Sequence, residues 1–137
     1  MDTAAFQLEN YKFTKVSLDV DQAAKNSNIS FGVSGLFDSS EQVPKYDLTF
    51  NVDVINNDTG EAFFSIECHG LFLFENEITI ETIPDFFYMN AIAILFPYVR
   101  AYLSLVASQA NIRPLILPTL NLSTLSPTLK ENTRLKN

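Results

Sequence analysis

The sequence predicts an α+β fold, with β-strands in the first half of the chain and helices in the second. Apolar residues alternate with polar ones from Tyr46 to Val54, which is the period of a half-buried strand. Turn-forming residues follow at 56–60, and a further strand-like segment comes after them. From Phe86 to Val106 the chain is mostly apolar over 21 residues, and its composition favours a helix. Because the chain has only 137 residues, we expect a single domain.

The composition indicates that part of the surface is covered by a partner. Apolar residues make up 47% of the chain and charged residues only 18%, which is low for a small soluble monomer. Twelve Phe and five Tyr side chains add more aromatic area than a domain of this size readily buries. We therefore expect some of these rings to line an interface or a groove.

The charge balance excludes several classes of partner. Nine basic against sixteen acidic residues give a net charge of −7, which argues against nucleic acid and anionic membranes. The single cysteine, Cys68, excludes an internal disulfide and fits a reducing compartment. The first residues lack the basic and apolar regions of a signal peptide. We expect a cytoplasmic protein.

The first predicted strand contains a change in the phase of its apolar alternation. Apolar residues alternate from Phe6 to Phe13 and from Val16 to Val20, but the phase slips by one between Leu8 and Tyr11. An extra residue in a β-bulge would explain this slip. A polar loop follows at 21–28, and the second strand is expected from Ile29 to Leu36.

The third and fourth strands are predicted to form a hairpin. They run from Tyr46 to Val54 and from Phe63 to Phe74, on either side of the turn at 56–60. The apolar alternation of the fourth strand breaks around Gly70, which predicts a second bulge there.

The apolar segment after Pro84 is expected to form a long buried helix. Asp85 is its candidate N-cap, and Pro97 either starts the helix or kinks it. The segment is long enough to cross a bilayer, but Arg100 makes insertion costly, so we expect no membrane insertion. The apolar stripe is wider than a sheet alone needs. The positions expected to form an oligomer interface are Tyr98, Val99, Tyr102, Leu103 and Val106.

An apolar loop is predicted after the long helix. Pro114 and Pro118 exclude a helix interior or a central strand there, although most of the neighbouring residues are apolar. Loops normally lie at the surface and are polar, so an apolar loop indicates binding. A short helix is expected after Pro127, followed by a basic tail.

Residues that could carry catalysis do not converge in the sequence. His69 is the single histidine and adjoins Cys68, and neighbours on a strand point to opposite faces. We interpret His69 as a structural residue near a turn. Four glycines form no phosphate-binding loop. We expect neither an enzyme, a metal site nor a cofactor.

Two motifs in the second half resemble a known family. The residues at 94–100, Ile-Leu-Phe-Pro-Tyr-Val-Arg, resemble the Leu-Phe-Pro-Tyr-Ala-Arg signature of SecB, the bacterial export chaperone. The residues at 117–122 resemble a second family segment at the expected distance, and strand residues at 6–8, 46–54 and 70–72 also match. The resemblance covers about residues 4–129 of a single domain at 1–137 and leaves a short basic tail at 130–137.

The resemblance implies a fold and a function. The expected fold is a four-stranded antiparallel sheet with a long helix and a short C-terminal helix packed on one face. Subunits would pair into a dimer of dimers and hold unfolded polypeptides in apolar grooves, without ATP. The expected client-binding residues are Ile112, Leu115, Leu117, Leu120 and Leu122.

Some positions depart from the family pattern. The loop at 21–28 lacks the aromatics that help build the family's groove. Asp19 and Glu67 match acids that contact the SecA motor, but Lys15 replaces one such acid. Two alternatives to an export chaperone therefore stay open. One is a SecB-like chaperone dedicated to a toxin–antitoxin system, and the other is a scaffold that binds one folded partner.

Overall fold

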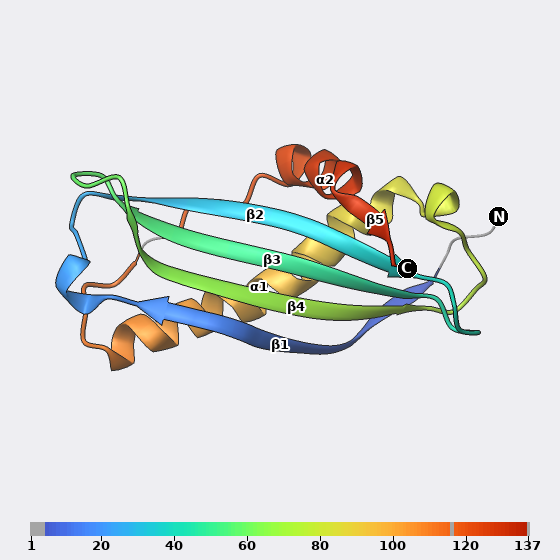
Figure 1. The fold of residues 1–137 in the computed structure, drawn as a ribbon, viewed down its shortest axis with the longest axis horizontal. Helices are drawn as coiled ribbons and strands as arrows, with labels where there is room; N and C mark the ends of the chain where they lie inside the picture. The colour runs from blue at the N-terminus through green and yellow to red at the C-terminus, as the bar shows by residue number, and fades with distance from the viewer. Residues whose placement is uncertain (1–4, 116, 137) are drawn as a thin grey trace.

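The computed structural model describes residues 5–115 and 117–136, so both ends of the predicted domain 1–137 lie outside the described residues (Figure 1). Two short 3-10 helices, at Val20–Gln22 and Ile80–Thr82, lie between the larger elements. The larger elements are β1 (Phe6–Leu18), β2 (Ser27–Asp38), β3 (Lys45–Asn56), β4 (Ala62–Phe74), α1 (Asp85–Gln109), α2 (Leu122–Glu131) and β5 (Thr133–Leu135).

The described strands form one five-stranded sheet in the order β1-β4-β3-β2-β5. The first four strands pair antiparallel, as predicted, whereas β5 pairs parallel to β2. The expectation of four strands is therefore wrong by one. The fifth strand lies in the segment that the sequence analysis assigned to a basic tail, and its three residues are too few to show a period.

Side-chain contacts hold β5 in place. The Tyr46 hydroxyl lies 2.5 Å from the Thr133 hydroxyl, which donates to the Leu129 carbonyl oxygen at 2.7 Å. The Asn132 amide donates to the Val33 carbonyl oxygen at 3.0 Å. These bonds tie the end of α2 to the middle of the sheet, and β5 follows directly.

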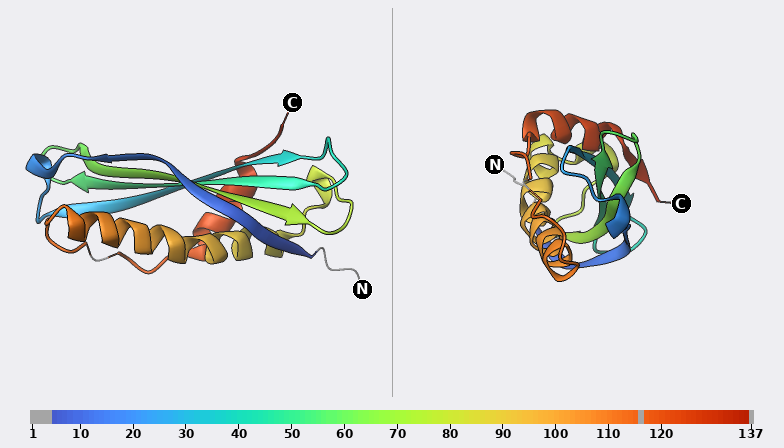
Figure 2. Two further views of the ribbon diagram at one scale, coloured as in Figure 1. Left: turned by 90° about the horizontal axis from the view of Figure 1, so that it is seen from below. Right: turned by 90° about the vertical axis from the view of Figure 1, so that its left-hand side faces the viewer.

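The core lies between the sheet and α1. Along β3 the side chains alternate between buried and half-buried positions throughout, as the sequence pattern predicts. Figure 2 shows α1 running across one face of the sheet, with the opposite face uncovered by any described helix. The residues of α1 that are buried against the sheet and its neighbours are Phe87, Tyr88, Ala91, Ile92, Leu95, Val99, Leu103 and Ala107.

Two bulges keep the apolar residues of β1 on the covered face. The first lies between Leu8 and Asn10, which confirms the predicted slip. The second, between Phe13 and Lys15, was not predicted. With the register reset, Tyr11 stacks on Tyr98 of α1 at a ring separation of 4.3 Å.

The predicted bulge at Gly70 is wrong. The pairing of β4 is continuous on both sides of Gly70, which occupies a regular inward position. A Cβ at Gly70 would lie 3.0 Å from Leu95 of α1, so the leucine side chain fills the space above the glycine. The apparent break in the alternation is therefore a missing side chain at an inward position.

The helix boundaries differ slightly from those predicted. Pro84 is the N-cap of α1 and Asp85 is its first residue, where a carboxylate still favours the helix N-terminus. The helix runs through Pro97, so Pro97 does not start it. Likewise α2 begins at Leu122 and contains Pro127, contrary to the predicted start after that proline.

Candidate functional site

The connection between α1 and α2 begins with a sharp turn. Asn111 has a positive φ of 60°, and its N–H donates to the Ser108 carbonyl oxygen at 3.1 Å. The Ile112 N–H donates to the Ala107 carbonyl oxygen at 3.2 Å. This pair of bonds is a Schellman motif, in which a left-handed residue ends a helix. The turn directs the chain at 112–115 back towards the sheet.

A groove of about 870 Å³ lies between this connection and the β1–β2 connection. Two segments that are far apart in the sequence meet there, at the end of the sheet where α1 stops (Figure 1). Its apolar lining includes Val20, Ala23, Ala24, Ile29, Phe63, Ile112, Leu115 and two prolines, Pro114 and Pro118.

The groove suits an extended apolar peptide segment. Val20 is 49% exposed, so apolar surface is open to solvent at the rim. Ser27, Asn28 and Asn111 also line the groove and offer hydrogen-bonding groups to a peptide backbone. Burying apolar side chains of a bound chain there would contribute about 25 cal/mol per Å². The described residues contain no cluster of three or more His, Cys, Asp or Glu that could hold a metal ion.

The structure brings part of the predicted client-binding set to this groove. Ile112 and Leu115 line it, whereas Leu117, Leu120 and Leu122 do not. Those three are half-buried and pack against the core. The polar loop at 21–28, which lacks the aromatics of the family's groove, contributes Ala23 and Ala24 to the lining.

The predicted oligomer residues fall into two groups. Val99 and Leu103 are each only 1% exposed because they face the sheet, so they are unavailable to another subunit. Tyr98 is 42% exposed, while Tyr102 and Val106 are half-buried. Other exposed apolar side chains of α1 are Phe86, Met89, Ile94 and Leu105. The outer face of α1 therefore carries several large apolar side chains, even though its inner face already supplies the core.

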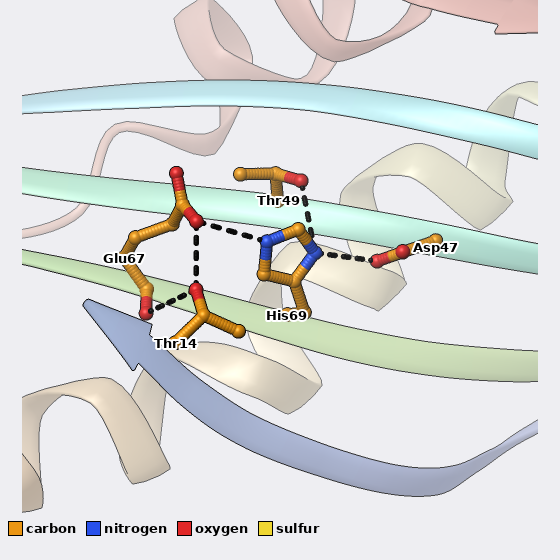
Figure 3. A network of polar contacts seen from close by, with 5 residues as sticks. All are labelled: Thr14, Asp47, Thr49, Glu67 and His69. Atoms are coloured by element: carbon orange, nitrogen blue, oxygen red, sulfur yellow. Dashed lines mark hydrogen bonds and ion pairs between the residues drawn. The ribbon is translucent and has the colours of Figure 1, made fainter.

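The open face of the sheet carries a polar network centred on His69 (Figure 3). Its Nδ1 atom lies 2.9 Å from Asp47 Oδ1 and 3.2 Å from the Thr49 hydroxyl. Its Nε2 atom lies 3.1 Å from Glu67 Oε2, which also accepts from the Thr14 hydroxyl at 2.7 Å. His69 lies within β4 and pairs with Thr49, so the interpretation as a residue near a turn is wrong.

The network favours a protonated imidazole. A carboxylate only accepts hydrogen bonds, so His69 can bond Asp47 and Glu67 together only when both ring nitrogens carry protons. Partial burial lowers the pKa of His69, but the bonds and charges of Asp47 and Glu67 outweigh it and raise that pKa. The bonds from Thr14 and His69 lower the pKa of Glu67.

The two predicted motor-contact acids occupy different settings. Glu67 belongs to the network on the open face, whereas Asp19 is exposed just after β1 ends.

Cys68 follows Glu67 in the sequence, but its side chain lies on the covered face and is fully buried. Burial raises the pKa of its thiol to about 12. It is therefore a thiol in the core and lacks the thiolate that a nucleophile needs.

Length and hydropathy alone would allow α1 to cross a bilayer. In this fold eight of its side chains are buried, and Tyr98 stacks on β1. The core helix of a soluble protein passes the same test.

Comparison with known proteins gives one family and one fold. The family model described as preprotein translocase subunit SecB matches residues 6–131. The fold resembles that of a Mycobacterium tuberculosis SecB-like chaperone, solved in complex with a ChAD peptide from an antitoxin. The TM-score is 0.65 and the identity 17%, over 85% of this chain and 88% of that one.

A curated relative is also similar in sequence. An uncharacterised protein of Methanocaldococcus jannaschii is 39% identical over 70 residues. The matched residues are 51% of this chain and 44% of that protein, so the match spans less than half of the relative's length.

Proposed function

Because the chain belongs to the SecB family, we propose that it is a chaperone that holds non-native polypeptides without ATP or enzymatic activity. The observation that carries this proposal is the groove between the β1–β2 and α1–α2 connections. Nine of the fourteen residues that line it are apolar, Val20 among them is exposed to solvent, and polar groups that can bind a peptide backbone lie beside them. Such a groove favours unfolded clients, since folded proteins hide the apolar side chains and backbone groups that would bind.

Each groove is expected to bind peptide segments of many different sequences, each with low affinity. Burial of apolar surface is non-directional and depends little on the identity of the side chain. Several grooves on one oligomer would add avidity to this binding. Protein export is the role that we propose for these clients, and the cytoplasm is the expected location.

Aggregation suppression tests the function. Two unrelated, chemically unfolded proteins are diluted with the full chain, and light scattering follows their aggregation. We expect the wild type to suppress the aggregation of both. Val20→Asp, which replaces an exposed apolar side chain of the lining with a hydrated carboxylate, should lose most of this effect because that carboxylate must lose water when an apolar client segment binds over it.

Val43→Asp is the matched control. Val43 is 43% exposed, close to the 49% of Val20, but it lies in the β2–β3 connection at the other end of the sheet. This variant should suppress aggregation as the wild type does. Equal failure of both variants, or a wild type that holds neither client, would contradict a client-binding groove. The mass of each sample is measured in parallel, so that loss of assembly is separated from loss of binding.

We further propose that the working form is an oligomer, a dimer of dimers. Strand β1 has 13 residues and forms one edge of the sheet, where unpaired backbone groups invite a second copy. The apolar outer face of α1, with Tyr98 and Leu105 exposed, supports a second contact. The parallel mass measurement should therefore give four times the 15.4 kDa of one chain, and a monomer or dimer mass at micromolar concentration would contradict this proposal.

A chaperone dedicated to one antitoxin is the second candidate. It is favoured by the antitoxin peptide bound to the mycobacterial SecB-like chaperone of similar fold. A general export chaperone should hold both test clients and bind SecA, with Asp19 and Glu67 as the proposed contacts. A dedicated chaperone should protect its antitoxin and show no SecA binding. A scaffold for one folded partner should hold neither unfolded client.

A further inference from the structure

The charge of the groove is opposite to that of the whole chain. The net charge of the protein is −7, yet the charged residues that line the groove are two cations, Lys25 and Arg113. Asp19 and Asp21 flank Val20 in the sequence, but neither lines the groove. The charged side chains in the lining itself are therefore both positive.

The two cations come from different connections. Lys25 lies between β1 and β2, and Arg113 lies between α1 and α2, so their charges meet only in the folded chain. Both residues are exposed, and neither has an ion-pair partner within residues 5–115 and 117–136. Lys45 and Lys130, in contrast, lie 3.0 Å and 2.7 Å from carboxylates of this chain.

Unpaired cations beside an apolar wall define a chemical preference. A guanidinium presents several N–H donors in a plane that fits a carboxylate, and a lysine ammonium adds a mobile point charge. Asn28 and Asn111, also in the lining, can satisfy the backbone of the same bound segment. A peptide segment with an anionic side chain next to apolar ones would contact the cations, the apolar residues and the asparagine amides of the lining.

We propose that the groove takes extended segments in which apolar residues are flanked by aspartate or glutamate side chains. The proposal rests on the function proposed above and names the class of client that the groove prefers. This preference is opposite to that of the remaining surface, which is acidic and favours basic partners by long-range attraction.

Three peptides test this preference. They share one apolar core of Leu and Phe and differ only in their flanks, which are Asp, Asn or Lys. Acetylated and amidated ends leave side-chain carboxylates as the only anions, and an uncharged fluorophore reports binding to the full chain by anisotropy. We expect the Asp peptide to bind about fivefold more tightly than the Asn peptide, and the Lys peptide more weakly than both. Near 1 M salt the differences should shrink because screening acts over about 3 Å there.

Substitutions locate the effect. In Lys25→Gln/Arg113→Gln, the ratio of the Asp and Asn dissociation constants should fall to about one, since the charges that create it are gone. Lys12→Gln removes an exposed cation from β1, outside the groove, and serves as the control. There the ratio should stay at about five, which shows that net charge alone does not set it.

The outcomes separate this inference from the proposed function. Equal binding of all three peptides, with weaker binding by Val20→Asp, would overturn the acidic preference and leave the chaperone groove in place. Tighter binding of the Lys peptide would also overturn it, and would assign recognition to the acidic surface. If no peptide bound and unfolded clients still aggregated, both the groove function and the preference would be wrong.

Discussion

The covered and the open face of the sheet are built from alternate residues of the same strands, but packing dominates the first face and polar interactions dominate the second. On the covered face Tyr46, Phe50 and Phe72 have no exposed surface, so the packing there tolerates little change in volume. On the open face the His69 network is partly solvated, with 27% of the histidine side chain exposed. Substitutions on the first face should alter stability, and those on the second should mainly alter its dependence on pH.

The largest expected effect is that of Leu95→Ala on the covered face. Truncating this fully buried leucine should lower the free energy of unfolding by about 3 kcal/mol, because it leaves a cavity above Gly70. Leu71→Ala, next to Gly70 on the open face and half-buried, should cost about 1 kcal/mol. Urea unfolding at one fixed protomer concentration measures both.

A second substitution sharpens this test. In Leu95→Ala/Gly70→Ala the new methyl group at position 70 points into the space that the leucine leaves. It should restore about 1 kcal/mol, since a buried carbon is returned to the cavity. A double variant less stable than Leu95→Ala alone would contradict the placement of Leu95 over Gly70.

The two glycines of β2 give an intermediate effect. At Gly35 an added Cβ would overlap the ring and hydroxyl of Tyr46, which crosses it towards Thr133. Gly35→Ala should therefore lower the unfolding free energy by about 2 kcal/mol. At Gly32, on the open face, the nearest atom to an added Cβ is the Asn51 Cβ, at 3.8 Å.

Gly32→Ala is thus the matched control on the same strand. It should change the unfolding free energy little or raise it by about 0.5 kcal/mol, because alanine narrows the unfolded ensemble. The urea midpoints of the two variants give the comparison directly. Similar losses of unfolding free energy in both variants would show that the loss of glycine itself destabilises the strand, and that the contact with Tyr46 does not contribute.

Much of the fold follows from local pattern. The alternation from Tyr46 to Val54 predicts β3, since one strand with one buried face produces it. The phase slip after Leu8 predicts the first bulge for the same reason. Gly70 misleads because a glycine at an inward position is indistinguishable, in sequence, from a break in phase. Only the position of Leu95 shows which of the two it is.

The remaining features depend on contacts between distant segments. Strand β5 has three residues, and it is held by bonds such as that from Asn132 to Val33. The groove joins Ile112 and Leu115, which the apolar loop predicts, to Val20 and others that no local pattern marks. The single signal in the sequence is an apolar residue, Val20, beside a polar loop, and it acquires meaning only when the two connections meet.

The smallest expected effect concerns His69, and its sign follows from the raised pKa. A folded-state pKa above the unfolded value of about 6.5 means that the stabilising contribution is fully present below pH 6.5. It is lost as the pH rises through the folded-state value. His69→Gln should therefore be less stable than the wild type near pH 6, by under about 1 kcal/mol for a partly exposed pair. Near pH 9 the difference should be smaller still.

Urea unfolding of both proteins at these two values measures the effect. A pH-independent difference between wild type and His69→Gln would show that the ring contributes only packing. In that case the open face would respond to volume, as the covered face does, and the contrast between the two faces would fail.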